Sequence, residues 1–317
     1  MKETHSSTRT AQEIVENVAK VIIGKKPVIE RALAAVIAQG HLLIEDVPGV
    51  GKTMLAKSIS VSIGCTFKRI QFTPDLLPSD IVGVSIYNQG TGEFQFRPGP
   101  VMSQVVLVDE INRATPKTQS ALLEAMEELQ VSVDGVTRPL ERPFVVMATQ
   151  NPIEYEGTFP LPEAQLDRFL MRISMGYPSF AEELSVIGGQ EKTHPIDQLE
   201  AVASSDDVIK LQDAAKNVYV DTAVREYIVS LIEATRNHED VSLGASPRAS
   251  LGMFRAVRAM AIFRDRDYVI PDDVKELAYA VLAHRLILSS AARMRGLQTR
   301  QVIDGLLESV AVPGASC

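Results

Sequence analysis

A strand-like segment, a glycine-rich turn and a Lys-Thr pair follow one another early in this chain. The apolar residues 42–44 precede Asp46-Val47-Pro48-Gly49-Val50-Gly51-Lys52-Thr53. Glycines let backbone N–H groups surround a polyphosphate, and the first turn of the next helix adds the positive end of its dipole. Lys52 is expected to reach the outer phosphates, and the Thr53 hydroxyl to bind Mg²⁺. The pattern predicts a loop that binds a nucleoside triphosphate; its expected contacts are Pro48, Gly49, Val50, Gly51, Lys52, Thr53 and Met54.

The loop departs from the usual motif at one position. A glycine ordinarily stands five residues before the Gly-Lys pair, and this chain has Asp46 there. The alternative is an ordinary glycine turn between a strand and a helix. The Lys-Thr pair and both flanking elements favour the phosphate-binding loop.

Size and composition limit the classes of protein to which this chain can belong. Its 317 residues suffice for two domains, and 45% hydrophobic residues are typical of a globular protein. The net charge of −8 argues against general attraction to nucleic acid. No apolar run approaches the roughly 18 residues of a membrane span, and the polar residues 1–10 do not match a signal peptide. Cys65 and Cys317 are too few for a disulfide framework, so we expect a cytoplasmic protein.

The first half of the chain alternates strand-like and helical segments. The expected strands are 41–45, 66–72, 105–109, 144–149 and 170–175, and the expected helices are 11–20, 27–39, 53–63 and 117–129. Continuous apolar runs are typical of parallel strands that helices cover on both faces. From residue 180 onward only helical periodicity is visible, over 207–217, 222–236, 247–263 and 272–284. We therefore expect an α/β domain over 1–178, with a flexible tail at 1–10, and a helical domain over 179–317.

A second strand-like run ends in two carboxylates. The apolar residues 105–108 lead into Asp109-Glu110, roughly 55 residues beyond the phosphate loop. At the tip of a strand, Asp109 can hold the water shell of Mg²⁺, and Glu110 can polarise the attacking water. Charged residues also end many surface strands, but beside the phosphate loop this pair predicts hydrolysis of the nucleotide.

Five sequence blocks, in this order, resemble the MoxR family of AAA+ ATPases. They are Val47–Thr53, Asp109–Ala114, Ala148–Pro152, Leu161–Phe169 and Gly244–Ala249, and the resemblance covers about residues 12 to 290. It implies an α/β AAA+ P-loop core with a parallel five-stranded sheet in the order 5-1-4-3-2, helices on both faces, two β-hairpin insertions and an all-α lid. It also implies ATP and Mg²⁺ as cofactors, and a homo-oligomeric ring that is usually a hexamer. The implied task is chaperone-like remodelling or maturation of a protein client, including metal-cofactor insertion, beside a partner with a von Willebrand factor A domain.

The resemblance implies roles for three residues outside the phosphate loop. Asn151 corresponds to the first sensor, which orients the lytic water; a turn-forming residue before Pro152 is the alternative. Arg168 resembles the arginine finger that reaches a neighbour's γ-phosphate, where a guanidinium suits the developing charge; a salt bridge with Asp167 is the alternative. Arg248, in the first turn of a lid helix, resembles the second sensor, which docks the lid when γ-phosphate is present; a solvated arginine is the alternative.

The remaining candidates concern the adenine and the lid. The run Val21-Ile22-Ile23-Gly24 stands where this family surrounds the adenine, so Val21, Ile22 and Gly24 are candidate contacts, with a plain core turn as the alternative. Arg113 is a candidate for facing a neighbouring site. His284 and Arg285 close a lid helix, where a positive pair suits the helix C-terminus, and we assign them no role in function.

Two predicted β-hairpins concern the substrate. Residues 84–86 and 93–96 flank a glycine-rich turn, and 131–133 and 136–138 flank Asp134-Gly135. The resemblance places both hairpins at the ring pore or on one ring surface. Neither has the Lys/Arg cluster that tracks phosphates, so we expect a protein substrate and no nucleic acid. A DNA-translocating motor, a metal-chelatase motor subunit and a non-enzymatic nucleotide-gated scaffold are the rival functions.

Overall fold

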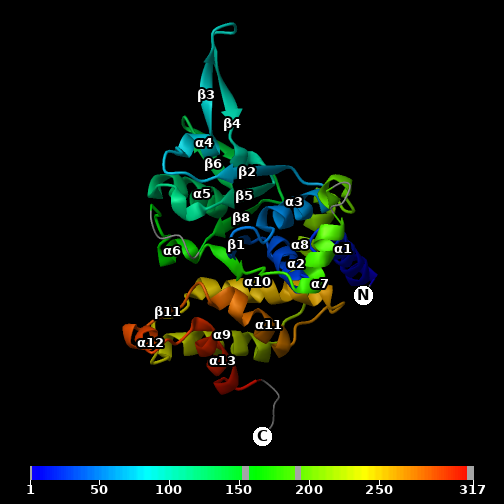
Figure 1. Ribbon diagram of the computed structural model, residues 1–317, viewed down its shortest axis with the longest axis vertical. Helices are drawn as coiled ribbons and strands as arrows, with labels where there is room; N and C mark the ends of the chain where they lie inside the picture. Colours follow the sequence, from blue (N-terminus) through cyan, green and yellow to red (C-terminus); the bar gives the residue numbers. More distant parts are fainter. Residues whose placement is uncertain (1, 152–156, 190–193, 313–317) are drawn as a thin grey trace.

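A five-stranded parallel sheet lies at the centre of the computed structural model, which describes residues 2–151, 157–189 and 194–312. Its strands lie in the order β2-β5-β8-β1-β9, and each neighbouring pair is parallel (Figure 1). Counted within this sheet alone, that is the predicted order 5-1-4-3-2, so the prediction is confirmed. The strands are β1 (His41–Glu45), β2 (Phe67–Gln71), β5 (Val105–Asp109), β8 (Val145–Gln150) and β9 (Phe169–Ile173).

Alternate apolar residues of each central strand pack against helices on opposite faces of the sheet. In β1, Leu42 and Ile44 belong to one buried cluster and Leu43 belongs to the other. Successive side chains of a strand point to opposite faces, so a wholly apolar strand needs cover on both sides. The first cluster is covered by α1 (Lys2–Ala19), α2 (Lys26–Ile37) and α3 (Lys52–Ser62), and the second by α5 (Pro116–Glu128).

The N-terminal segment differs from the prediction of a flexible tail over 1–10. Helix α1 begins at Lys2 and packs against α10 (Pro247–Phe263). Thr8 is buried, and its hydroxyl donates to the carbonyl of Ile262 at 2.9 Å. Serine and threonine have low helix propensity, which hides this part of the helix in the sequence, while the contact with α10 stabilises it.

The second half of the chain is mostly helical. Ser246 accepts a hydrogen bond from the N–H of Arg248 at 3.1 Å, and Pro247 fills the first turn of α10, whose bounds agree with the predicted helix over 247–263. The all-α prediction misses a two-stranded antiparallel ribbon of β10 (Val241–Leu243) and β11 (Ile287–Leu288). Strands this short carry no periodicity. The other helices are α7 (Phe180–Gly189), α8 (Ser205–Asn217), α9 (Thr222–Asn237), α11 (Pro271–Leu282), α12 (Ser290–Met294) and α13 (Thr299–Ser309).

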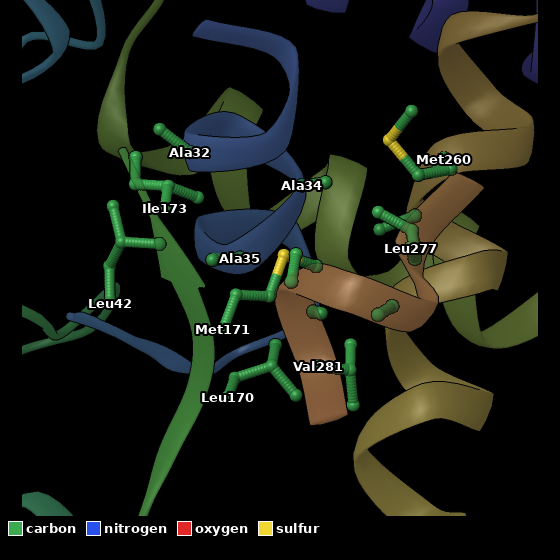
Figure 2. Close-up of a cluster of buried hydrophobic side chains, with 14 of the residues drawn as sticks. Ala32, Ala34, Ala35, Leu42, Leu170, Met171, Ile173, Met260, Leu277 and Val281 are labelled. Carbon is green, nitrogen blue, oxygen red and sulfur yellow. The ribbon is translucent and has the colours of Figure 1, made fainter. Parts of the chain in front are cut away.

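One hydrophobic cluster contains side chains from both halves of the chain. Figure 2 shows Met171 of β9 near Ala35 of α2 and Val281 of α11. Leu42 of β1 belongs to the same cluster. Burial of shared apolar surface is the main force that holds such elements together. The lid therefore lies against the sheet edge formed by β9, and the division of the chain at residue 178 stays a prediction.

Both predicted hairpins are present. The strands β3 (Gly83–Asn88) and β4 (Glu93–Pro98) project beyond the body of the molecule (Figure 1), and β6 (Gln130–Val133) pairs with β7 (Val136–Pro139). Gly83 has a φ of 104°, and a Cβ there would lie 2.4 Å from the carbonyl of Arg97, so only glycine fits. Within the described ranges, no helix is long and apolar enough to cross a membrane. The short elements are α4 (Pro78–Val82), α6 (Glu163–Leu166), and the 3₁₀ helices Pro100–Met102, Ile111–Arg113 and Pro195–Gln198.

Candidate functional site

The phosphate-binding loop joins the carboxyl end of β1 to α3. Gly49 and Gly51 have φ values of 86° and 91°, which only glycine adopts readily. No atom lies within 4 Å of the place where a Gly49 Cβ would stand, so backbone conformation and not crowding requires glycine there. Gly51 is the residue before α3, and the N-terminus of a helix directs its first N–H groups toward a phosphate.

A cavity of about 370 Å³ adjoins this loop and contains most of the residues expected to handle phosphate. The strands β1, β5 and β8 all end here, because the carboxyl ends of parallel strands share one edge of a sheet. Asn151 enters the cavity directly after β8, and Pro152 lies outside the described residues. The lining residues are Pro48, Gly49, Gly51, Lys52, Thr53, Met54, Arg69, Gln71, Asp109, Glu110, Thr149 and Asn151.

Thr53 and Asp109 supply the oxygen atoms that suit Mg²⁺. Asp109 is buried at the end of β5, and the Thr149 hydroxyl donates to its Oδ1 at 3.1 Å. Arg69 of β2 pairs with the other oxygen, with Nε 2.5 Å from Oδ2. Mg²⁺ usually binds through one or two protein oxygens together with phosphates and water. The donor set fits this ion, and Arg69 is the cation with which it would compete for Asp109.

The carboxylate of Glu110 is held by two neighbouring side chains. Gln71 donates from Nε2 to Oε2 at 2.6 Å, and Arg113 donates from its guanidinium to the same oxygen at 2.9 Å. The backbone of Glu110 has a φ of 56°, a strained value for a residue with a side chain, and its N–H donates to the Thr149 hydroxyl at 3.0 Å. Arg113 thus binds Glu110 of its own chain in the single subunit, and its assignment to a neighbouring site stays a prediction. Sequence reasoning missed Gln71 and Thr149, since single polar residues on strands form no motif.

A second cavity, of about 290 Å³, shares Gly49 and Gly51 with the first. Its wall is largely apolar, which suits a flat base beside the polar phosphate cavity. Its members expected from the sequence are Val21, Ile22, Val50 and Met54, and those that the sequence missed include Met175, Pro178 and His194.

Gly24 is a predicted adenine contact that the structure does not place in this wall. It has a φ of 76°, and a Cβ there would stand 1.8 Å from Glu182 Oε1. The positive φ is what requires glycine there, since Glu182 Oε1 is the end of a flexible side chain that can move. Its neighbours Ile23 and Lys25 line the cavity, and the Gly24 assignment stays a prediction.

Arg168 and Arg248 lie at the opposite edge of the sheet. Arg168 immediately precedes β9, and the cavity of about 250 Å³ that it lines also includes Gly40 and His41 at the amino end of β1. The length of a five-residue strand separates this edge from the phosphate loop by about 16 Å. Both arginines bind one carboxylate: the Arg168 guanidinium lies 3.0 Å from Glu127 Oε2, and Arg248 pairs with Oε1.

Two expectations concern these arginines. Arg248 pairs with Glu127 and does not line the phosphate cavity of its own chain, so the structure does not show the predicted docking of the lid there. The alternative for Arg168, a salt bridge with Asp167, is not formed either, because Arg168 pairs with Glu127. Asp167 instead accepts a hydrogen bond from the Ser246 hydroxyl at 2.7 Å.

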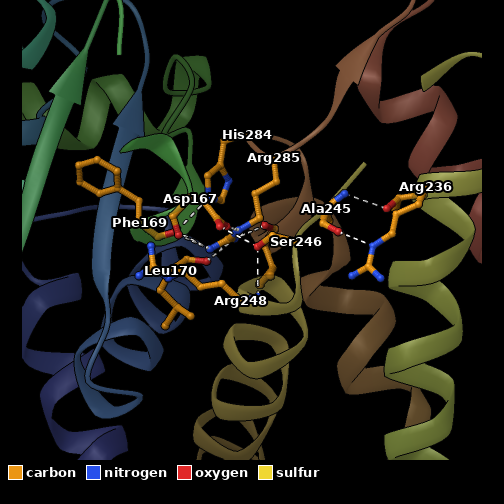
Figure 3. A network of polar contacts seen from close by, with 11 residues as sticks. Asp167, Phe169, Leu170, Arg236, Ala245, Ser246, Arg248, His284 and Arg285 are labelled. Atoms are coloured by element: carbon orange, nitrogen blue, oxygen red, sulfur yellow. Dashed lines mark hydrogen bonds and ion pairs between the residues drawn. The ribbon is translucent and has the colours of Figure 1, made fainter. Parts of the chain in front are cut away.

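Arg285 joins the lid to the core, a role that the sequence did not predict (Figure 3). It pairs with Asp167, Nε to Oδ1 at 2.6 Å, and donates to the carbonyls of Phe169 and Leu170 at 2.7 and 3.1 Å. Burial lowers the pKa of Arg285, while the Asp167 carboxylate raises it. Burial, with the neighbouring guanidinium, also holds the pKa of His284 well below its ordinary value, so His284 is neutral. A positive pair after a helix gives no sign of such partners.

Known proteins resemble this chain over nearly its whole length. The family described as "ATPase family associated with various cellular activities (AAA)" matches residues 41–171, and the AAA lid domain matches 233–306. The protein YeaC of Bacillus subtilis is 56% identical over 94% of this chain and 93% of the relative. Chaperone MoxR1 of Mycobacterium tuberculosis is 46% identical over 97% of this chain and 84% of its own.

A more distant relative and a solved structure also resemble this chain over nearly its whole length. Protein MoxR of Methylorubrum extorquens is 30% identical over 96% of this chain and 95% of its own. The crystal structure of an ATPase from Cytophaga hutchinsonii has a TM-score of 0.91 and 41% identity, covering 98% of this chain and 97% of that one. The chain is an ATP hydrolase that belongs to the MoxR family of AAA+ ATPases.

Proposed function

We propose that this chain is one subunit of a homo-oligomeric ring in which each ATP is hydrolysed between two neighbours. The observation that carries the proposal is the position of Arg168 and Arg248, which lie about 16 Å from the phosphate loop of their own chain, farther than an arginine side chain reaches. A ring whose subunits contact head to tail places the amino edge of one sheet near the carboxyl edge of the next. The two arginines would then serve the neighbour's γ-phosphate.

The proposed division of labour follows from the contacts in the phosphate cavity. Lys52 and the N-terminus of α3 bind the phosphates, and Thr53 and Asp109 hold Mg²⁺, which neutralises charge on the outer phosphates when bound. Glu110 activates the lytic water, which Asn151 orients. Gln71 and Arg113 both bond to Oε2 of Glu110, so we assign the proton of the lytic water to Oε1.

Glu127 is the proposed internal counter-ion of the two arginines. Its two oxygens bind Arg168 and Arg248 in the free subunit, as two phosphate oxygens would. Arg255 and Arg285 line the same cavity, so positive groups outnumber the carboxylates of Glu127 and Asp167. This excess of positive charge favours replacement of the Glu127 carboxylate by an incoming phosphate.

The first hairpin is the proposed contact for a protein client. Phe94 at 74% exposed, Tyr87 at 52% and Ile86 at 46% project from β3 and β4 into solvent. Tyr87 and Phe94 pack with ring centroids 5.3 Å apart, so they form one apolar surface. Exposed aromatic surface suits a polypeptide better than a phosphate backbone, which requires lysine or arginine clusters.

The cellular task that fits these features is chaperone-like remodelling or maturation of a client, including metal-cofactor insertion. The name Chaperone MoxR1, given to the Mycobacterium tuberculosis relative, supports the first part of this proposal. A hexamer and a partner with a von Willebrand factor A domain are retained from the sequence resemblance, and a cytoplasmic location from the polar N-terminal residues and the two cysteines. Binding of single-stranded DNA at low micromolar protein, lost as salt rises, would favour the DNA-translocating alternative instead.

Mixing two inactive variants tests the shared active site. Arg168→Ala keeps the phosphate loop but lacks the finger, and Lys52→Ala keeps the finger but lacks the phosphate contact. In equimolar mixed rings about one quarter of the interfaces combine the intact loop of one variant with the intact finger of the other, so ATP turnover should recover to about that fraction of the parent.

The controls separate this result from a general effect. Arg225→Ala removes an exposed arginine of α9 whose guanidinium donates to the Thr222 hydroxyl at 3.2 Å, and should turn over ATP like the parent. Turnover per subunit should also rise with protein concentration. No recovery in the mixture, together with parent-like turnover of Arg168→Ala alone, would overturn the proposal.

A further inference from the structure

Asp46 stands where the phosphate-binding motif has a glycine, and its side chain is almost fully buried. It is 8% exposed. One carboxylate oxygen accepts the N–H of Val47 at 2.8 Å. The other accepts three hydrogen bonds, from the Ser174 hydroxyl at 2.9 Å and from the N–H groups of Met175 and Gly176, both at 2.7 Å. A carboxylate with four donors is a built position and not a tolerated substitution.

These hydrogen bonds keep the carboxylate ionised inside the protein. Desolvation acts to raise the pKa of Asp46, but the bonds from Gly176, Ser174 and the other donors lower it below its ordinary value. A negative charge beside a polyphosphate would repel it. Asp46 is not among the residues that line the phosphate cavity; it lines a separate cavity together with Arg172.

The partners of Asp46 belong to the segment that leaves the core. Residues 174–176 follow β9 and lead toward α7. Met175 and Gly176 also line the apolar cavity beside the phosphate loop. On the loop side, the Lys52 ammonium donates to the backbone carbonyl of Asp46. Asp46 therefore contacts two parts of the site. Its backbone carbonyl contacts Lys52, which serves the phosphates, and its side chain contacts the wall of the base cavity.

We propose that Asp46 is a positioning residue that fixes the phosphate loop and the wall at 174–176 at the spacing a nucleotide requires. It acts through Lys52 and through Met175 and Gly176, and it does not touch the nucleotide. The proposal rests on the nucleotide site described above. It opposes the prediction from the motif alone: Asp46→Gly restores the usual glycine, yet it leaves three donors of the 174–176 segment without their acceptor and weakens binding.

Binding of Mg·ADP, measured by titration calorimetry, tests the proposal without relying on turnover. We expect Asp46→Gly to weaken binding by about tenfold or more. Asp46→Asn should give an intermediate loss, because the amide keeps one acceptor oxygen but turns an NH₂ group toward other donors. The matched control is Asp221→Gly, which removes a carboxylate that accepts a backbone N–H, from Ala223 at 2.9 Å, at the start of α9. It should bind like the parent.

Amide hydrogen exchange at Met175 and Gly176, whose N–H groups bond to Asp46, supplies a second measurement that a general loss of stability would not reproduce. In the parent these amides should exchange slowly, and more slowly still with Mg·ADP. In Asp46→Gly they should exchange fast even at saturating Mg·ADP, while the β5 amides stay protected.

Each outcome separates this proposal from the nucleotide site itself. Parent-like affinity and parent-like exchange in Asp46→Gly, or an equal loss in Asp221→Gly, overturn the role of Asp46. If Asp46→Gly does not fold, Asp46→Asn decides by the same two measurements, and parent-like values again overturn it. Failure of the parent to bind Mg·ADP would overturn the nucleotide site and the positioning role together.

Discussion

Replacing Arg285 with methionine removes the guanidinium that joins the lid to the core while keeping a long side chain. The Arg285 side chain is 3% exposed, pairs with Asp167 at 2.6 Å, and donates to the carbonyls of Phe169 and Leu170. Removing one partner of a buried ion pair costs about 3–5 kcal/mol, because the other charge stays buried. Asp167 is 18% exposed and keeps its bond from Ser246, so we expect the lower end, about 3 kcal/mol of unfolding free energy.

Urea denaturation measures this loss directly. The midpoint should fall while the slope stays constant, because the same surface is exposed on unfolding. The hydrophobic cluster shared by lid and core predicts a single transition in the parent. Arg225→Met, at an exposed position of α9, should change the free energy by less than about 0.5 kcal/mol. A loss below about 1 kcal/mol for Arg285→Met, or an equal loss for Arg225→Met, would refute the reasoning.

Two further changes test the site and the core. Gln71→Leu removes the amide that donates to the Glu110 carboxylate, a hydrogen bond worth about 1 kcal/mol. Without this restraint on Glu110, we expect basal ATP turnover to rise about two- to fivefold and the affinity for Mg·ADP to stay unchanged. A fall in turnover would show that Gln71 positions Glu110 instead. Burial lowers the pKa of His41 from 6.5 to about 4, and its Nδ1 accepts the N–H of Val146 at 3.0 Å, so the folded protein needs the neutral ring. As the pH falls, the unfolded chain binds a proton at His41 before the folded protein does. The stabilisation by the neutral ring is therefore complete above pH 6.5, and about 3 kcal/mol of unfolding free energy is lost as the pH falls to 4. Urea midpoints across this range should fall less steeply in His41→Asn than in the parent, and parallel curves would contradict the assignment.

The sheet and the phosphate loop could be predicted from the sequence because their signals are local. The apolar runs ending at Glu45, Asp109 and Gln150 mark buried parallel strands, and the glycines of the loop have backbone conformations that only glycine adopts readily. The resemblance then supplied the strand order, which no single segment encodes. For Lys52, Thr53 and Asp109, position in the chain sufficed to bring them to one cavity.

The missed features depend on neighbours that are distant in sequence. Gln71 is one polar residue on a short strand until β2 pairs with β5 and brings it to Glu110. In the sequence, Arg285 looks like an ordinary solvated arginine at a helix C-terminus. Only the packing of α11 on β9 buries it. In each case the deciding contact is tertiary.

The position of Arg168, the proposed finger, follows from the lid network. Arg168 is the next residue after Asp167, whose carboxylate is bound by Ser246 and Arg285 of the lid, and the Arg168 guanidinium is bound by Glu127 of the core. The backbone of Arg168 is thus fixed from one side and its head group from the other, which is the preorganisation that the proposed finger would require. Arg248, two residues after Ser246, also pairs with the Glu127 carboxylate. The contribution of the lid is therefore expected at the neighbour's phosphate, where it holds both arginines, and not over the nucleotide of its own chain.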